Sequence, residues 1–450
     1  MIEKDRVKVL NREEFKKRKY ILYWMQASQR TEYNHALEYA ILKANKTNMP
    51  VIVYFGLTDN LPEANARHYH FMLEGLKEVE SSLEEKGIRM IVRHTSPPVG
   101  VVELSKDASL VVVDRGYLRT QKKWRRYVAH SIECPLVQVE SDVIIPVETA
   151  SPKEEYSAAT LRPKIHKKLD YFIRPFKENY PKVDSLQLNL DTFDIDDSEK
   201  VLSTLEIDKS VSKVMDFHGG TTEAEKHLEI FLRDKLEYYE ELRNDPTKEI
   251  VSNMSPYLHF GQISPLHIAL RVMETNTPGK DAYLEQLIVR RELSVNFVFY
   301  NENYDSFDGL PEWAKKTLKD HEKDPRKYTY ILKELENAET HDPYWNASQR
   351  EMTSTGKMHG YMRMYWGKKI IEWSKTPKEA YKTAIYLNNK YELDGRDLNG
   401  FTSVAWCFGK HDHPWKERQI FGKIRYMNAN GLKRKFDADE YVAKIQMISS

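Results

Sequence analysis

The sequence is poor in cysteine, with only Cys134 and Cys407 among its 450 residues. Two thiols so far apart exclude a Cys-x-x-Cys zinc site and a four-cysteine iron–sulfur cluster, and they favour a reducing compartment. Long apolar runs are also missing: none approaches the ~20 residues that a membrane-spanning helix needs. The charged N-terminus lacks the apolar segment of a secretion signal. We therefore expect a cytoplasmic protein that binds no metal and no membrane.

The composition is typical of a globular chain, because hydrophobic residues make up 40% and charged residues 30%. A length of 450 residues predicts two or three domains. Each domain is then large enough to fold without disulfide or metal support.

The net charge is only +1, but the charges are unevenly distributed. Residues 351–450 contain 18 Lys and Arg against 11 Asp and Glu, and six of the eight tryptophans lie beyond residue 300. Basic side chains beside flat aromatic rings suit a nucleic-acid surface, where phosphates are neutralised and bases are stacked. A solvated basic face over an aromatic core explains the same numbers, and composition alone favours that simpler interpretation.

Short apolar segments alternate with amphipathic ones as far as residue 140. Near-continuous apolar strands joined by helices predict a parallel sheet covered on both faces, in a doubly wound, Rossmann-like α/β fold. No Gly-x-Gly-x-x-Gly follows the first strand, which argues against an ordinary dinucleotide site. The polar turn at residues 26–30 either holds a ligand or caps the next helix, and the cap is the favoured interpretation. The expected strands are 20–25, 50–57, 89–94, 109–114 and 136–140, and the expected helices are 30–46, 64–85, 100–106 and 119–130.

The second half has a different pattern. Residues 147–215 lack long periodicity and contain four spaced prolines, which predicts an extended linker with some helix. Helical periodicity then continues from residue 221 almost to the C-terminus, for example over 222–243, 280–300, 360–374 and 377–391. We therefore divide the chain into an α/β domain at 1–146, a linker at 147–215 and an all-helical domain at 216–450.

Three stretches of the helical half differ from ordinary helix surface. The hydroxyl-rich segment 252–255 precedes an apolar helix, and together with Arg243 it forms either a phosphate-binding segment or a simple helix cap. Trp366 and Trp373 lie on one helix face, ~10 Å apart along the axis, as a core pair or as an electron-hopping pair. The polar segment 388–399 is either a ligand-binding loop or a capped helix–loop–helix junction.

Six segments of the sequence resemble the DNA photolyases in their order, and most closely the class II cyclobutane pyrimidine dimer (CPD) photolyases. They are 243–248 (RNDPTK), 255–264 (SPYLHFGQIS), 341–348 (HDPYWNAS), 354–361 (STGKMHGY), 391–397 (YELDGRD) and 422–427 (GKIRYM). The resemblance implies an α/β domain able to hold an antenna chromophore, deazaflavin or folate, and a helical domain that binds FAD. It implies a carbon–carbon lyase of DNA repair, in which an electron from excited reduced FAD splits a flipped-out dimer.

The same resemblance assigns residues to the flavin. Arg363 and Asp394 would pair beside the isoalloxazine ring, and Asn388 would face its N5 atom. Trp366, Trp345 and Trp373 would form the chain that reduces the flavin in light. The residues implied to contact the ribityl–phosphate part are Tyr239, Val251, Ser252, Asn253, Met254 and Ser255.

DNA contacts are implied as well. A dimer inside a duplex must be flipped out to reach a buried cofactor, and photolyases are a known example of such flipping. The aromatic ring of Trp406 could recover ~1–3 kcal/mol by stacking on an extruded base. The residues implied to contact the lesion or the DNA are Gln286, Arg290, Met364, Trp406, Trp415 and Arg425.

One position departs from the family pattern. Gln286 stands where the repair enzymes carry a glutamate that contacts both pyrimidines, and an amide cannot supply a proton or a charge. Glu285 lies about 100° away around a helix and does not replace it. This departure is the main argument for the alternative function, a cryptochrome-like flavin photoreceptor without efficient repair. We expect a monomer in the cytoplasm or at the nucleoid, with dimer-containing DNA as its partner.

Overall fold

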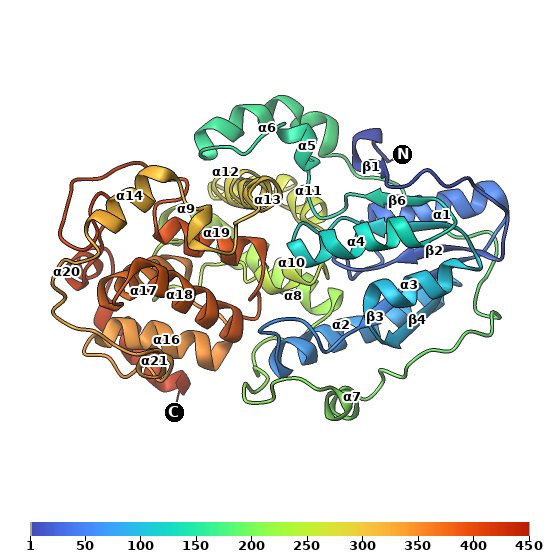
Figure 1. Cartoon of the computed structure of the whole chain (residues 1–450). Helices are drawn as coiled ribbons and strands as arrows, with labels where there is room; N and C mark the ends of the chain where they lie inside the picture. The colour runs from blue at the N-terminus through green and yellow to red at the C-terminus, as the bar shows by residue number, and fades with distance from the viewer. Residues whose placement is uncertain (1, 450) are drawn as a thin grey trace.

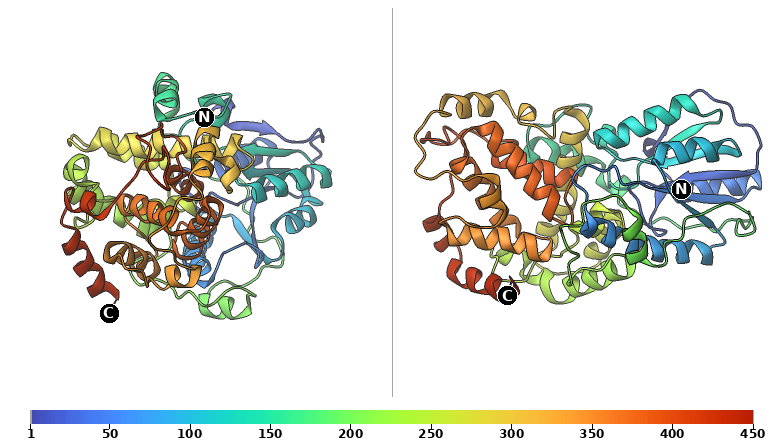
Figure 2. Two further views of the ribbon diagram at one scale, coloured as in Figure 1. Left: turned by 60° about the vertical axis from the view of Figure 1, so that its left-hand side comes forward. Right: turned by 60° about the horizontal axis from the view of Figure 1, so that its bottom comes forward.

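The structure is a computed structural model that describes residues 2–449. A sheet with its covering helices occupies one side of the molecule, and a large group of helices occupies the other (Figures 1 and 2). This arrangement confirms the predicted α/β N-terminal part and all-helical C-terminal part.

The sheet has six strands in the order β1-β6-β5-β2-β3-β4. Neighbouring strands are parallel except for β1 (Val7–Val9), which pairs with β6 in the antiparallel direction. Sequence reasoning missed β1 because three residues are too few to show a periodicity. The other strands are β2 (Tyr20–Trp24), β3 (Val51–Leu57), β4 (Arg89–His94), β5 (Ala108–Asp114) and β6 (Leu136–Val139).

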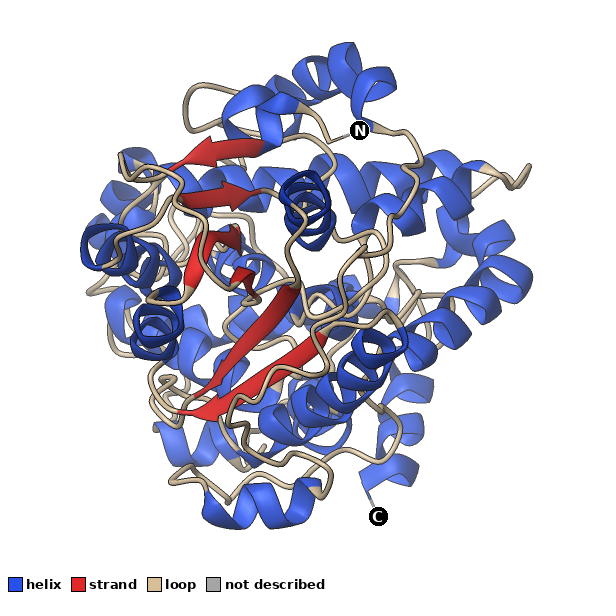
Figure 3. Cartoon of the chain, turned by 90° about the vertical axis from the view of Figure 1, so that its right-hand side faces the viewer, coloured by secondary structure: helices blue, strands red, loops and turns tan. Residues whose placement is uncertain are grey.

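Helices cover both faces of the sheet (Figure 3). Alternate residues of β2 point to opposite faces, and both sets are buried, as in a parallel sheet between two helical layers. Ile21 and Tyr23 lie in the core with α1 (His35–Thr47) and α2 (Ala66–Glu85). Leu22 and Trp24 lie in the core with α3 (Pro97–Ser105) and α4 (Arg119–Ser131).

The segment between the two parts contains more helix than expected. It holds α5 (Val147–Ala150), α6 (Ala158–Phe172) and α7 (Ser198–Thr204). The proline-based prediction underestimated α6, whose Leu161 and Ile165 are fully buried although Pro163 lies inside the helix. Between α6 and α7 the chain is extended and runs along the outside of the sheet (Figure 1).

The helical part follows the predicted periodicity, with two interruptions. The expected helices 222–243 and 280–300 each contain a π-helical turn, at Phe231–Lys235 and at Glu285–Arg290, and such turns are frequent at functional sites. No helix within residues 2–449 is both long and apolar enough to cross a membrane. The helices are α8 (Thr221–Ile230), α9 (Tyr239–Leu242), α10 (Ser255–His259), α11 (Pro265–Met273), α12 (Lys280–Leu284), α13 (Arg291–Tyr300), α14 (Glu312–Asp320), α15 (Leu332–Glu336), α16 (Pro343–Thr355), α17 (Gly360–Trp373), α18 (Pro377–Tyr391), α19 (Leu398–Cys407), α20 (Ala429–Lys433) and α21 (Ala438–Ser449).

Candidate active site

Three tryptophans from two helices stack in the core of the helical part. Trp345 of α16 lies parallel to Trp366 of α17, with 6.5 Å between ring centroids, and edge-on to Trp373, with 5.5 Å. All three are at most 2% exposed. Hydrogen bonds fix two of the rings, because Trp345 Nε1 donates to the carbonyl of Trp366 (3.0 Å) and Trp366 Nε1 to Gln349 Oε1 (2.8 Å). Trp345 therefore bridges the two tryptophans of α17 by ring contact.

The Trp373 end of this stack is covered by two further rings. Tyr330 and His341 lie 5.3 and 5.4 Å from Trp373. The Tyr330 hydroxyl accepts the backbone N–H of His341 (3.0 Å) and lies 2.6 Å from His341 Nδ1. Tyr328, which is 38% exposed, stacks on His341 at 3.7 Å, so an unbroken series of rings leads from the core to the surface.

Buried charges gather around Arg363, one turn before Trp366 on α17. Its Nη2 atom pairs with Glu392 Oε1 at 2.8 Å, so the direct partner is Glu392 rather than the expected Asp394. Asp394 is also near, since the charges of both acids raise the pKa of Arg363. Glu392 takes this place because its carboxylate also accepts the backbone N–H of Met358 (3.2 Å). Burial raises the pKa of Glu392.

Several polar atoms of this cluster lack a partner. Arg363 Nε, Glu392 Oε2 and His359 Nε2 are buried without a hydrogen bond to any described residue. Asn388, only 2% exposed, lies at the last turn of α18 and packs against Gly400, where an added Cβ would come within 2.8 Å of the Asn388 amide nitrogen. Unpaired buried donors and acceptors are costly unless a ligand satisfies them.

Hydroxyl and cationic groups meet before α10. Lys357 Nζ donates to Ser255 Oγ (2.9 Å), and the Tyr283 hydroxyl donates to Ser252 Oγ (3.1 Å). Neither serine caps α10, whose first residues have no side-chain cap, so the simple helix-cap explanation does not hold. Arg243 lies over the ring of Tyr239 at 6.0 Å. The other expected residues complete the segment: Val251 and Asn253 are half-buried, and Met254 is buried.

The π-helical turn at Glu285–Arg290 faces the aromatic residues of α19. The Arg290 guanidinium lies 5.5 Å from the ring of Trp406, which meets His411 edge-on at 5.6 Å. Glu285 is engaged by Arg162 (2.7 Å) and Arg290 (3.2 Å). The Gln286 amide makes no hydrogen bond within residues 2–449, and it is therefore open to an external partner.

The remaining expected DNA contacts are Trp415, Arg425 and Met364. Trp415 is 41% exposed and carries Arg425 over its ring at 5.3 Å. Its Nε1 donates to Asp412. Met364 is half-buried and contacts the thiol of Cys407 (3.7 Å between sulfur atoms). The structure thus groups Arg290 with Trp406, and separately Arg425 with Trp415 on a surface loop.

A cavity of about 420 Å³ opens at the carboxyl ends of the parallel strands, between the two parts of the chain. It lies where β2 adjoins β5 and β3, the switch point at which doubly wound sheets bind ligands. Trp24 Nε1, both amide atoms of Gln26 and Gln29 Oε1 are buried there without a partner among the described residues. Asn389 and Arg396 line the cavity from the helical part.

The turn at residues 26–30, which borders this cavity, is not a helix cap. Asn34 caps α1 instead, with its side chain accepting two backbone N–H groups. The backbone N–H groups of residues 26–28 donate to Asp114 at the end of β5. An internal carboxylate therefore satisfies these N–H groups. Burial beside Asp142 raises the pKa of Asp114 to about 6.

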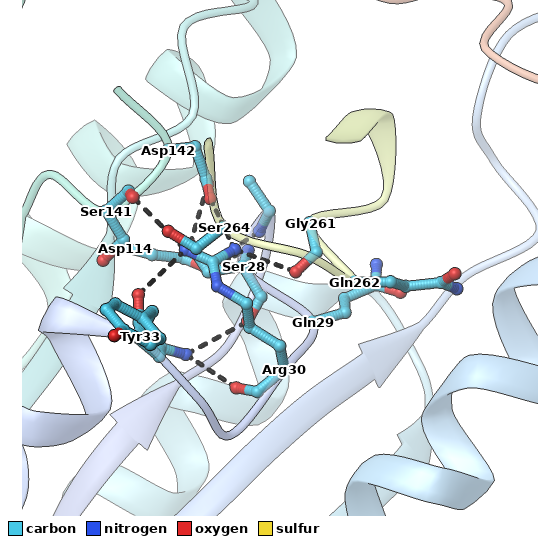
Figure 4. A network of polar contacts seen from close by, with 12 residues as sticks. Ser28, Gln29, Arg30, Tyr33, Asp114, Ser141, Asp142, Gly261, Gln262 and Ser264 are labelled. Carbon is cyan, nitrogen blue, oxygen red and sulfur yellow. Dashed lines mark hydrogen bonds and ion pairs between the residues drawn. The ribbon is translucent and has the colours of Figure 1, made fainter. Parts of the chain in front are cut away.

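Arg30 extends this network into the helical part (Figure 4). Its Nη1 atom donates to Asp142 (2.7 Å) and to the carbonyl of Gly261 (2.8 Å). Gly261 has φ +67°, and an added Cβ would lie 1.8 Å from the carbonyl of Ala27. Only glycine therefore allows the two backbones to approach this closely.

Sequence reasoning did not single out Lys357 and Glu392. Both lie inside the segments that resemble the family, 354–361 and 391–397. The one feature of the sequence that could have indicated them is a charged residue within a glycine-containing motif. Which acid pairs with Arg363 depends on how the chain turns after α18, and spacing alone does not give that.

Fold and site define a protein with a cavity at a sheet switch point and a tryptophan stack one turn from a cluster of charged groups with unpartnered polar atoms. A family model described as DNA photolyase matches residues 21–182. The chain is 56% identical to "Deoxyribodipyrimidine photo-lyase" of Methanothermobacter thermautotrophicus over 99% of both chains. It is 41% identical to the protein of that name from Arabidopsis thaliana, over 96% of this chain and 89% of the relative. The chain belongs to the DNA photolyase family.

Solved structures share the fold. A class III photolyase from Agrobacterium tumefaciens superposes with a TM-score of 0.70 at 20% identity, covering 96% of this chain and 87% of the other. A Synechocystis cryptochrome gives a TM-score of 0.73 at 15% identity, with 94% and 87% covered. An archaeal photolyase from Sulfolobus tokodaii, described with two FAD molecules, gives 0.71 at 15% identity, with 95% and 92% covered.

Proposed function

We propose that this chain is a class II CPD photolyase, which uses light and FAD to split cyclobutane pyrimidine dimers in DNA. The observation that carries the proposal is the contact series Trp366–Trp345–Trp373, one turn from Arg363, whose Nε atom is buried without a partner. The 56% identity to a photo-lyase over the whole chain supports the same activity. In this account residues 216–450 form the flavin-binding domain, 1–146 the antenna domain and 147–215 the linker.

The residues present fit FAD. Arg363 Nε is a buried donor that an acceptor atom on the edge of a heteroaromatic ring would satisfy. Ser252, Ser255 and Lys357 offer hydroxyls and a positive charge to its phosphates, and the ring of Tyr239 packs against Tyr283, which donates to Ser252. Bound and reduced, FAD supplies the light-driven electron for the dimer, while the protein sets distance and electrostatics.

The stacked tryptophans would deliver electrons towards that site. Each ring contacts the next, and all three are buried. Trp366 would pass an electron inward, and a reductant in solution would return one to Trp373 from the surface side. Asn388, held at the end of α18, would face the flavin N5 atom. The three tryptophans would prepare the active oxidation state of the flavin, and they would not be required in each repair cycle.

Trp406 and Arg290 would receive the lesion. A flipped-out dimer presents ring faces that stack on the indole, and the guanidinium can bind a phosphate or a base edge. Gln286 is open to hydrogen-bond that base edge without carrying a charge. Basic residues of the loop around Trp415 and Arg425 would neutralise phosphates, so DNA binding weakens as salt rises.

The strand-end cavity would hold an antenna chromophore. Its unpaired groups are neutral amide and indole atoms, which match a planar ring with alternating N–H and carbonyl groups, as in a deazaflavin or a folate. Cofactor extraction and mass spectrometry distinguish the two. The protein would act as a monomer.

A cryptochrome-like photoreceptor is the second candidate function, and Gln286 is the residue that favours it. The similarity to a cryptochrome at 15% identity concerns the fold alone, and this fold is compatible with either function. Light-dependent loss of dimers from irradiated DNA, measured beside a dark control, separates the two. Bound flavin without dimer loss would favour the photoreceptor.

A further inference from the structure

Helix α2 of the α/β part reaches into the helical part through its first turn. Arg67, 4% exposed, donates from Nη1 to the carbonyl of Tyr391 (2.7 Å) and from Nη2 to that of Thr353 (2.6 Å). Nη1 also donates to the carbonyl of Met352 (3.3 Å), and Nε donates to the carbonyl of Ser212 (2.9 Å). Met352 and Thr353 belong to the last turn of α16, and Tyr391 ends α18. One guanidinium therefore satisfies the C-terminal carbonyls of two helices.

Two neighbours of Arg67 complete the arrangement. Asn65 Nδ2 donates to the carbonyl of Lys390 (2.7 Å). His68 Nδ1 accepts the backbone N–H of Asn65 (3.2 Å), so its Nε2 carries the proton and donates to the carbonyl of Glu392 (2.9 Å). Burial holds the pKa of His68 well below its usual range, which keeps this tautomer neutral. Three successive carbonyls, 390–392, thus receive donors from the N-cap and the first turn of α2.

Burying the charge of Arg67 costs free energy, and its position at two helix C-termini offsets that cost. No carboxylate lies within ion-pair distance of Arg67 in residues 2–449, and burial lowers the pKa of Arg67 to about 10, although the charge of Glu392 opposes this shift. A buried charge is expensive without a partner, but a cation at a helix C-terminus is stabilised by the helix dipole and the unpaired carbonyls. Arg67 serves two such termini at once.

Both capped helices carry residues of the flavin site. Asn388 lies one turn before the capped end of α18, and Glu392, which pairs with Arg363, follows that end directly. Trp345 and Gln349, which hold the tryptophan stack together, belong to α16. The relative position of these groups is therefore set at the two termini that Arg67 joins.

We propose that Arg67 and His68, on the α/β domain, are positioning residues of the flavin site, which they hold in register by capping α16 and α18 across the domain boundary. The inference rests on the flavin assignment made above. It makes the α/β domain part of the flavin-binding machinery as well as a holder of the antenna.

The test uses the full-length protein with its bound FAD and the variants Arg67→Met and Arg67→Lys. We expect FAD to dissociate at least about tenfold faster from Arg67→Met, since charge-assisted hydrogen bonds are lost at both termini. Arg67→Lys keeps the charge but lacks the planar guanidinium that reaches both helices. Its rate of FAD dissociation should therefore lie between those of the wild type and Arg67→Met. Hydrogen exchange of the backbone amides at 352–356 and 388–394 should accelerate in the same order.

Arg125→Met is the matched control. Arg125 is likewise a buried arginine of the α/β part, but its guanidinium donates to the carbonyl of Gly116 within that part. This variant should lower thermal stability without faster FAD release or faster exchange at 388–394. Equal FAD release from Arg67→Met and Arg125→Met would show a general loss of stability and overturn the proposal.

A second pair of variants covers the case in which Arg67→Met does not fold. His68→Gln keeps a donor for the carbonyl of Glu392, whereas His68→Ala removes it, so only His68→Ala should accelerate FAD release and local exchange. Equal behaviour of the two would contradict the proposal. If wild-type protein proved unable to bind FAD, the proposed function would fail, and exchange at 388–394 in the flavin-free variants would still decide whether the caps hold these helices.

Discussion

The side-chain amide of Asn388 donates to Oδ1 of Asn389 at 3.3 Å, and this contact joins the two proposed ligand sites of the molecule. Asn388 is buried among the residues that we propose to hold FAD, whereas Asn389 lines the strand-end cavity. The same Oδ1 atom accepts the backbone N–H of Arg396 (2.9 Å), which also lines that cavity. A ligand that moves Asn389 therefore acts directly on the residue expected to face the flavin.

Replacing Asn389 by Leu should shorten the lifetime of the photoreduced flavin. The substitution removes the acceptor that orients the Asn388 amide, and a loss of about 1 kcal/mol corresponds to roughly fivefold faster reoxidation. The measurement is the recovery of oxidised-flavin absorbance in the dark, in air. Tyr386→Phe, which removes a hydroxyl bonded to Lys390 on the same helix (3.2 Å), is the control. Unchanged recovery in Asn389→Leu would remove this contact from the account.

Trp366→Phe should block light-driven reduction of the oxidised flavin while chemically reduced protein still repairs dimers. The ring that contacts Trp345 at 6.5 Å is the inner end of the proposed relay, and phenylalanine is far harder to oxidise. Photoreduction and repair are followed in separate assays. Trp313→Phe, outside the stack, is the control. Equal loss of both activities would mean that Trp366 is only structural, since its Nε1 also satisfies Gln349.

Trp406→Ala should weaken binding of dimer-containing DNA by about 1–3 kcal/mol, the stacking contribution of one base, and leave the FAD content unchanged. Arg290, which now lies over this ring, would lose its packing surface but keep its pairing with Glu285. Titration of lesion DNA at fixed salt measures the effect. Lesion affinity equal to wild type would exclude Trp406 from the pocket.

Glu292 should make the protein less stable as the pH rises from 5 to 8. Burial raises the pKa of this carboxyl to about 7, so the folded state holds its proton more tightly than the unfolded state. Its contribution is complete below the unfolded pKa and is lost as the pH passes about 7, by roughly 3 kcal/mol at most. Glu292→Gln still accepts the backbone N–H groups of Ile144 and Ile145 and should flatten this part of the profile. An unchanged profile of thermal midpoint against pH would contradict the assignment.

The regular elements could be predicted because their patterns are local. The strand from residue 20 follows from an apolar run, and the helix 377–391 follows from helical periodicity. Both patterns lie within a short stretch of sequence. The strand β1 is too short for such a pattern, and the π-helical turn at Gln286 depends on tertiary packing.

The site was predicted less completely, for the same physical reason. The tryptophans could be recognised by type and spacing, yet only the fold inserts Trp345 between the two rings of α17. Arg67 lies far from residue 391 in the sequence, and its caps arise where two parts of the chain meet. No periodicity or motif within α2 could indicate that contact.

The most direct test of the account is a repair assay on irradiated oligothymidine, in light and in darkness, combined with extraction of the cofactor from the same preparation. The account predicts about one FAD per chain and a recovery of base absorbance only in the illuminated sample. A protein that contains no FAD and cannot be reconstituted with it, or dimers that disappear equally in the dark, would contradict it.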